Sequence, residues 1–231
     1  MALAAVPSGL MLSTTTHLTT DIVAVPLLWV LPLALYLLSF VIAFAHRRGA
    51  ANLIVAIAPL FLLVAGGFAF SGGTDLPFIT ATLGLLLLFI IAVALHAEMY
   101  RKRPEPAHLT AFYLAMAVGG VLGGVFCAIL APTVFDWAYE HPLLIVAAAL
   151  LMPQSPFIPW TQDMPARFRW LLVIGALALS YAIDWSLGPF TSDGTALLGS
   201  ILISLIALAF IGFRWAFAFG LLALMLSYGG W

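Results

Sequence analysis

Residues 76–95 read LPFITATLGLLLLFIIAVAL, and residues 109–131 read LTAFYLAMAVGGVLGGVFCAILA. Each stretch has the roughly 20 apolar residues that a helix needs to cross the hydrocarbon core of a bilayer, and neither contains a charged side chain. The apolar residues are continuous and do not alternate with polar ones, which is typical of helices rather than of strands. The two stretches therefore predict an all-α membrane protein.

The composition of the whole chain agrees with this prediction. Of its 231 residues, 65% are hydrophobic and 7% are charged, and the mean hydropathy is +1.18. A soluble domain carries about 25% charged residues, so these values exclude a soluble enzyme, a disordered chain and a disulfide-stapled secreted domain. The net charge of −1 also argues against binding to nucleic acid, which requires a basic surface.

Further apolar runs indicate one integral membrane domain, a polytopic transmembrane helix bundle over residues 1–231. We expect eight spans, at residues 22–45, 53–70, 76–95, 109–131, 142–160, 168–187, 195–213 and 215–231. Pro153, Pro156 and Pro159 interrupt the fifth span. Residues 2–20 are uncharged but rich in hydroxyl groups. They predict an additional polar-faced first helix, with an interfacial or re-entrant segment as the alternative.

The positive charges predict how the spans are oriented. The eight Lys and Arg residues all fall in alternate connections, at Arg47, Arg48, Arg101, Lys102, Arg103, Arg167, Arg169 and Arg214. The positive-inside rule makes these connections cytoplasmic. We therefore expect a multi-pass protein of the cytoplasmic membrane with its C-terminus outside.

Two groups of residues are candidates for function within or beside the spans. The first is the polar face of residues 2–20 together with the acid that follows it, and these residues are Ser13, Thr16, His17, Thr20 and Asp21. Positions 13, 16, 17 and 20 share one helical face. We expect this face to line a polar cavity, and an outer-surface loop is the alternative.

The second group lies in the connection HAEMYRKRPEPAH at residues 96–108, and its members are His96, Glu98, Arg101, Lys102, Arg103 and His108. Because a short loop joins two helix ends here, we expect His96 and His108 to approach each other, with Glu98 nearby. The cations suggest a cytoplasmic docking site for an anionic group or a soluble partner. The alternative is an orientation signal whose cations meet lipid phosphates.

Four glycines in residues 109–131 predict a close contact between helices. They form two overlapping pairs spaced four residues apart, Gly119, Gly120, Gly123 and Gly124. Such a strip lets another helix approach closely. We expect packing within the chain, and a moving interface or a partner contact is the alternative.

No metal, cofactor or catalytic residue is expected. The five histidines lie near predicted helix ends, and no Cys/His spacing typical of a metal site occurs in the sequence.

Two segments resemble a known family. Residues 6–44, VPSGLMLSTTTHLTTDIVAVPLLWVLPLALYLLSFVIAF, and residues 96–142, beginning HAEMYRKRPEPAH, resemble the membrane region of bacterial fused major-facilitator/spermidine-synthase proteins. The resemblance implies a major-facilitator-like module of the bacterial inner membrane that transports a small molecule, with a polyamine suggested by analogy. It also implies that this chain lacks helices that precede the module in the family. We therefore expect the lipid bilayer, and other membrane subunits or a missing N-terminal helical half, as partners.

The same sequence lacks the glycine-rich nucleotide loop that a synthase domain requires, so we expect no aminopropyltransferase activity and no enzyme. An alternative function from a different class is a non-catalytic accessory subunit of a larger membrane complex, such as a respiratory or photosynthetic assembly. The small size of the chain favours this alternative.

The predicted orientation is testable with single cysteines in a Cys127→Ala background. We expect cysteines at Gly73 and Ser192 to react with an impermeant reagent added to sealed cells. Both positions lie in connections without Lys or Arg, which the positive-inside rule places outside. A cysteine at Pro104 should react only after the cells are opened. Labelling at position 104 in sealed cells would contradict the orientation.

Overall fold

The chain is helical throughout the part that the computed structural model describes. That part comprises residues 1–19, 27, 29–68, 77–136, 138–156, 158, 163–187 and 194–228. The helices are α1 (Ala2–His17), α2 (Val30–Phe44), α3 (Gly49–Phe68), α4 (Pro77–Arg101), α5 (Leu109–Val125), α6 (Ala131–Val134), α7 (Glu140–Leu151), α8 (Ala166–Leu187), α9 (Gly194–Ala209) and α10 (Arg214–Tyr228). A short 3₁₀ turn, η2 (Pro106–His108), precedes α5, and a π turn, η3 (Phe126–Leu130), joins α5 to α6. No strand occurs in these ranges, which confirms the all-α prediction.

Three helical segments are long and apolar enough to cross a membrane. They are Gly49–Gly66 in α3, Phe78–Arg101 in α4, and Pro106–Val134, which runs from η2 through α5 and η3 to α6. Shorter apolar helices occupy Val30–Phe44, Glu140–Leu151 and Arg214–Met225.

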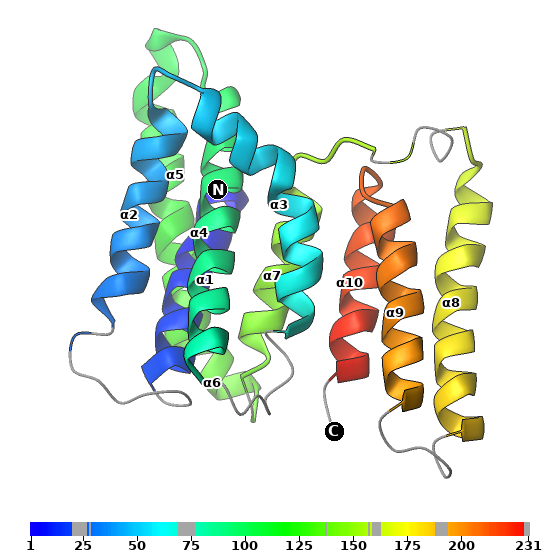
Figure 1. Ribbon diagram of the computed structural model, residues 1–231. Coiled ribbons are helices and arrows are strands. Elements are labelled where there is room, and N and C mark those ends of the chain that lie inside the picture. Colours follow the sequence, from blue (N-terminus) through cyan, green and yellow to red (C-terminus); the bar gives the residue numbers. More distant parts are fainter. Residues whose placement is uncertain are drawn as a thin grey trace.

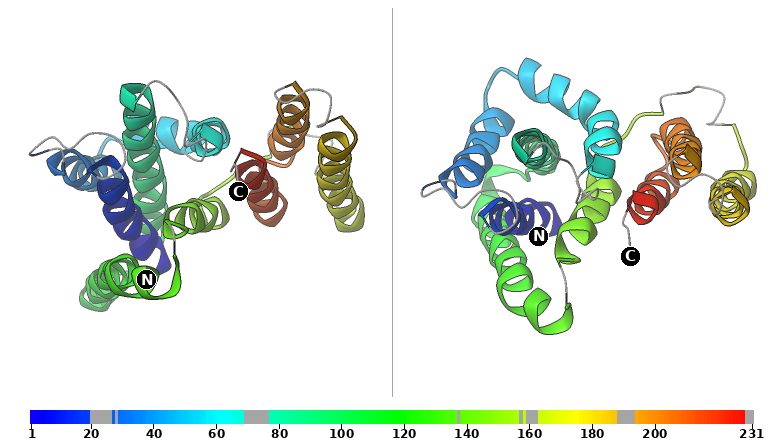
Figure 2. Two further views of the ribbon diagram at one scale, coloured as in Figure 1. Left: turned by 90° about the horizontal axis from the view of Figure 1, so that it is seen from below. Right: turned by 60° about the horizontal axis from the view of Figure 1, so that its bottom comes forward.

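Helix α4 forms the centre of the larger of two helix groups. Helices α1, α2 and α3 pack around it, and α5 and α7 pack against α1 (Figure 2). Every residue of α4 from Ile90 to Ala97 is buried. The second group, α8 to α10, lies beside α3 and α7 (Figure 1). Helix α10 makes most of the contacts between the groups, and α9 also contacts α3.

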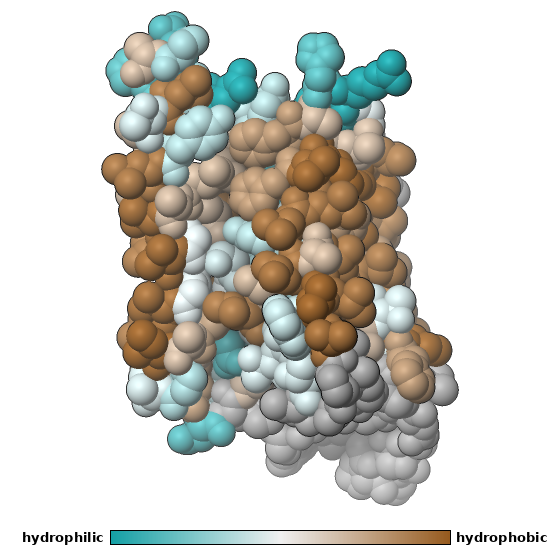
Figure 3. Space-filling model, turned by 90° about the vertical axis from the view of Figure 1, so that its left-hand side faces the viewer, coloured by the Kyte–Doolittle hydropathy of each residue, from teal (hydrophilic) through white to brown (hydrophobic). Residues whose placement is uncertain are grey.

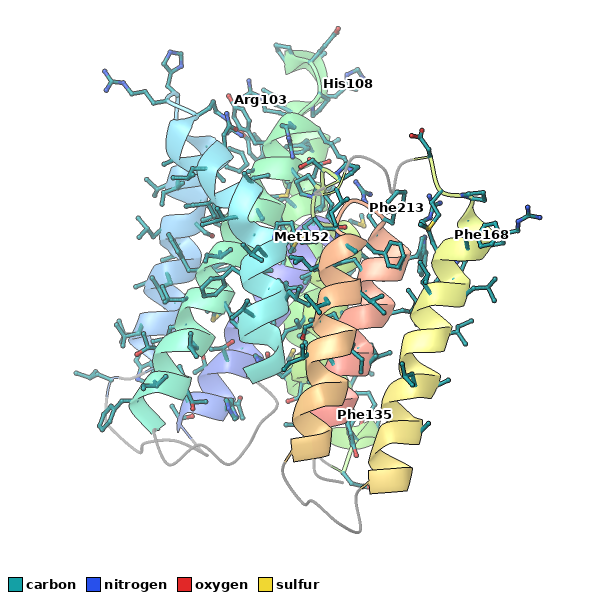
Figure 4. The ribbon with its side chains drawn as sticks, turned by 45° about the vertical axis from the view of Figure 1, so that its right-hand side comes forward. Arg103, His108, Phe135, Met152, Phe168 and Phe213 are labelled. Atoms are coloured by element: carbon teal, nitrogen blue, oxygen red, sulfur yellow. The ribbon has the colours of Figure 1, made fainter. Side chains whose placement is uncertain are left out.

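The connections that carry the cations lie at one end of both groups, which we call the cation-bearing end. Figure 4 shows Arg103, His108, Phe168 and Phe213 at this end and Phe135 at the opposite end. On the face formed by α2 and its neighbours, a hydrophobic belt lies between hydrophilic residues at the two ends (Figure 3). The fold therefore brings together the cationic connections that are separated in sequence.

Several helix boundaries differ from those expected. Helix α2 begins only at Val30, and Pro32 lies in its first turn, where proline is tolerated. Residues 22–26 of the expected span lie outside the described residues. Helix α4 continues to Arg101, six residues beyond the expected end. Helix α7 ends at Leu151 because the chain turns to an extended conformation at Met152, just before Pro153.

Helix α1 begins inside the bundle and not at its cation-bearing end. The carbonyl of Met1 lies against Gly119, in the middle of α5. Helix α1 therefore runs from the interior of the bundle toward the end opposite the cations, and its described residues do not extend along the whole bundle.

The contact between α1 and α5 uses one side of the glycine strip. A Cβ on Gly119 or Gly123 would overlap the backbone carbonyl of Met1 or Ala5, respectively. Gly120 would meet nothing within 4 Å, and Gly124 would meet only the Leu12 side chain at 3.8 Å. Bare Cα atoms thus let the two backbones touch, and the Ser8 hydroxyl donates a 2.9 Å hydrogen bond to the Gly120 carbonyl across the contact.

This asymmetry gives a matched pair of variants. Gly123→Leu should destabilise the protein by about 1–3 kcal/mol or more, because its side chain must displace the α1 backbone. Gly120→Leu adds the same side chain where the structure has space, so it should be nearly neutral. The folded fraction after heating in mild detergent measures both. Equal losses for the two variants would contradict the α1–α5 contact.

Candidate functional site

A cavity opens at the cation-bearing end, where the two helix groups meet. We call it the α3 cavity; its volume is about 760 Å³, and Asn52, Val55, Ala56, Ile57, Pro59, Leu60, Arg101, Pro153, Gln154, Ser155, Pro156 and Ile211 line it. The volume falls within the roughly 300–1,000 Å³ of small-molecule sites. The α3 cavity is therefore large enough to hold a small molecule.

The extended segment after α7 forms one wall of the cavity. Pro153 and Pro156 prevent this segment from continuing the helix, and Gln154 connects it to α7 and to the α9–α10 turn. The Gln154 amide nitrogen donates to the Ala149 carbonyl at 2.6 Å, and its amide oxygen accepts from the Gly212 backbone at 3.1 Å. Gly212 has φ +105°, and a Cβ there would lie 2.6 Å from Pro156. Glycine is thus required where the α9–α10 turn meets this wall.

The lining separates into a polar and an apolar part. Asn52, Arg101 and Ser155 contribute polar groups at the cation-bearing end, and Ile57, Pro59 and Leu60 contribute the apolar wall further along α3. Arg101 is the only charged residue in the lining. The α3 cavity is therefore suited to an amphipathic molecule with a neutral or anionic polar group.

The charges around Arg101 leave an excess of positive charge. Its guanidinium lies 2.7 Å from a Glu98 oxygen, and the Lys102 ammonium lies 3.3 Å from the other oxygen of the same carboxylate. One acid is thus shared by two cations, so this group keeps a net charge of +1. Glu98 holds Arg101 at the cavity without neutralising the rim.

The remaining candidate residues of the 96–108 connection do not form the expected cluster. His96 continues α4, as expected for a residue at the end of this span, and it is 0% exposed, so its ring is not available at the surface where His108 lies. His108 is exposed at the start of α5. The Arg103 guanidinium lies 5.0 Å from the centre of the Tyr100 ring, and Arg48 approaches the same ring at 4.3 Å. These cation–π contacts keep the last turn of α4 ordered.

His96 instead forms a buried pair with Ser39 of α2. The Ser39 hydroxyl lies 2.8 Å from Nδ1 of His96 and donates to the Tyr36 carbonyl at 2.6 Å. If the single hydrogen of the Ser39 hydroxyl points to the Tyr36 carbonyl, Nδ1 donates to the Ser39 oxygen, and the neutral ring carries its lone pair on Nε2. Nε2 has no hydrogen-bond partner among the described residues. The Phe40 ring covers the imidazole, with the ring centroids 3.7 Å apart.

A second serine–histidine pair lies near the opposite end of the bundle. Ser13 of α1 lies 2.9 Å from Nδ1 of His141 on α7, and His17 stacks on His141 with the ring centroids 6.0 Å apart. Thr16 is exposed and hydrogen-bonds to the Leu12 carbonyl at 3.2 Å. The structure thus brings two members of the predicted polar face, Ser13 and His17, against α7. Thr20 and Asp21 lie outside the described residues.

The burial of the two pairs limits their chemistry. The Ser39 and Ser13 side chains are 0% and 3% exposed, so neither hydroxyl reaches a substrate in this conformation. Among the described residues, no group of three His, Cys, Asp or Glu residues is arranged to hold a metal ion. The pairs are consistent with polar groups that link helices. Within them, only Nε2 of His96 is a buried atom left without a hydrogen-bond partner in the described part of the chain.

Sequence reasoning missed several of these residues. Ser39 and Asn52 each stand as a single polar residue within or beside an apolar run, whereas His141 follows Glu140 and Gln154 precedes Ser155. For Ser39 and Asn52, that isolation was the available signal, because an isolated polar side chain in such a run needs a partner from another helix.

Comparisons of the chain with protein-family models, with curated proteins and with solved structures found no match.

The Ser39–His96 bond predicts a measurable coupling. Ser39→Ala should destabilise the protein by about 0.5–2 kcal/mol, because Nδ1 of His96 loses its partner in a buried site. His96→Leu together with Ser39→Ala should cost less than the sum of the two single variants. Denaturant titration in detergent measures all three, and Ser155→Ala, at an exposed serine, serves as the control. Additive effects would contradict the bond.

Proposed function

We propose that the chain is a multi-pass module of the cytoplasmic membrane and that it transports a small polar solute. In this proposal, the eight expected spans and α1 lie in the bilayer, and the cation-bearing end faces the cytoplasm. Large apolar side chains on the outer faces of the helices support this placement; they include Leu37, Val41, Leu53, Val64, Val121, Leu171 and Leu205. Lipid solvates such a surface, whereas soluble monomers rarely expose large contiguous apolar patches to water.

The unpartnered Nε2 of His96 is the observation on which the transport function rests. A buried acceptor without a donor is costly in an apolar interior and requires an explanation. Thr14 of α1 provides a second buried oxygen without a partner among the described residues. Intramembrane ionisable residues often mark a path for a solute or proton. A solute that donates a hydrogen bond to Nε2 would satisfy His96.

In this proposal, α2 moves to give a solute access to His96. The Phe40 ring covers the imidazole, so a solute reaches Nε2 only when α2 moves away from α4. Helix α2 lies at the edge of its group, where its principal contact is with α4 (Figure 2). Helix α2 can therefore move without displacing α5 or α7.

The polar groups favour one class of solute. Polyamines are polycations and need acidic partners, yet no Asp or Glu appears among the buried residues of the described part, and Arg101 supplies the charge in the α3 cavity. We therefore propose a neutral or zwitterionic solute in place of a polyamine. The resemblance of residues 6–44 and 96–142 to the membrane region of fused major-facilitator/spermidine-synthase proteins supports a transporter-like module, and membership of that family is part of the proposal.

One observation favours the accessory-subunit alternative. Only 17% of the 18-residue apolar window within the segment Pro106–Val134 is buried. This long apolar segment offers a broad surface to lipid or to a neighbouring membrane subunit. A subunit packed against it would give the segment a structural role that does not involve transport.

Uptake by proteoliposomes tests the function. We expect accumulation of at least one radiolabelled solute from a panel of neutral and zwitterionic amino acids, and at least a tenfold loss in His96→Leu. His108→Leu, at an exposed histidine, should leave uptake unchanged. Uptake of spermidine alone would contradict the proposed solute class. No uptake of any solute, with stable co-purification of larger membrane proteins, would favour the accessory role.

A further inference from the structure

We propose that the α3 cavity binds an anionic phospholipid, with one acyl chain along α3 and the phosphate at Arg101. This inference rests on the proposed membrane placement but not on transport. Three observations support it: the length of the apolar wall, the charge of the rim and the exposure of the apolar lining residues on α3.

The apolar wall follows the axis of α3. The lining residues of this helix extend from Asn52, near its first turn, to Leu60. Eight residues of helix correspond to about 12 Å, which is a length that an extended hydrocarbon chain can follow. The lining is polar at the cation-bearing end and apolar further along α3. A phospholipid has the same order, with a polar headgroup followed by an apolar chain.

The rim favours a negative charge. Arg101 has 47% of its side chain exposed, whereas Glu98, which it contacts, is only 12% exposed. The guanidinium can therefore bind a phosphate while it keeps Glu98 as its other partner. The side chains of Asn52 and Ser155 are exposed at the same rim and can donate hydrogen bonds to phosphate oxygens.

Two apolar residues of the lining are exposed on the outside of α3. Ile57 and Leu60 are 43% and 46% exposed, and both belong to the lining. In a bilayer, this side faces the hydrocarbon region, so a lipid can enter laterally from the leaflet at the cation-bearing end. A free phosphate would occupy only the rim and leave the apolar wall unfilled. The geometry thus favours a lipid over a soluble anion.

Anionic lipids are known to bind between helices at basic cytoplasmic pockets, and the α3 cavity differs from the other cationic surface of this protein. Arg48 and Arg103 both stack on Tyr100, and neither lines the cavity. Arg103 is therefore a matched control for Arg101, since the two cations are two residues apart at the same end of α4. Leu53 is a matched control for Leu60, because it is exposed on α3 but is not part of the lining.

Native mass spectrometry of the purified protein in neutral detergent tests the proposal, with phosphatidylglycerol and phosphatidylcholine as probes. We expect phosphatidylglycerol to bind at least fivefold more tightly than phosphatidylcholine. Arg101→Gln, which removes the charge, and Leu60→Trp, which fills the apolar wall, should each weaken phosphatidylglycerol binding by at least fivefold. Arg101→Lys, Arg103→Gln and Leu53→Trp should change it by less than twofold. Melting temperatures of all variants identify any loss caused by misfolding.

Three outcomes would overturn the lipid site. Equal losses in Arg101→Gln and Arg103→Gln would indicate a general basic surface. Unchanged binding in a folded Leu60→Trp variant would mean that no acyl chain lies along α3. Inorganic phosphate that competes with phosphatidylglycerol at equal concentration would identify a free-anion site. Solute uptake is measured separately, so failure of the lipid site and failure of transport are distinguishable.

Discussion

The rest of the larger helix group depends on the close approach of α1 to Gly119 and Gly123. In a membrane, van der Waals contact replaces the hydrophobic effect as the force between helices, so the missing side chains of these glycines determine how near α1 can come. Once α1 lies against α5, its other faces meet α4 and α7. The Ser8 hydroxyl then reaches the Gly120 carbonyl, and the Cys127 thiol donates to the Gly9 carbonyl at 3.3 Å. These hydrogen bonds determine the axial position of α1 relative to α5 and η3, which apolar contacts alone would not determine.

The same placement of α1 organises the polar groups inside the bundle. Ser13 reaches His141 only because α1 lies between α5 and α7, and Ser39 reaches His96 because α2 packs on the buried face of α4. Both serines are close to the carbonyl three residues earlier in their own helix, so both histidine Nδ1 atoms meet a hydroxyl that is already oriented. The interior of an apolar bundle thus contains two ordered histidines, and the Nε2 atom of His96 is left as an acceptor.

The α3 cavity arises from a different constraint, the early end of α7. A helix of 12 residues is about 18 Å long, which is shorter than the hydrocarbon core of about 30 Å. The proline-containing segment that follows α7 is extended, and the Gln154 side chain hydrogen-bonds to backbone groups of both α7 and the α9–α10 turn. Since an extended segment is thinner than a helix, it leaves space beside α3. The proposed lipid site and the proposed solute path are therefore separate features, one between the helix groups and the other within the first group.

The sequence by itself determined the all-α class, because long apolar runs with 7% charged residues leave few alternatives, and it placed every cation in alternate connections. It also identified the glycine strip and the weakness of the span that contains three prolines. It did not determine which glycines face another helix, that His96 is buried, or that Gln154 joins α7 to the α9–α10 turn. The tertiary structure decided these points because each depends on a contact between residues far apart in sequence. Ser39 and His96 are 57 positions apart, Gln154 and Gly212 are 58, and Ser13 and His141 are 128. Local patterns define which residues form helices, whereas the partner of a buried polar group depends on which helices become neighbours.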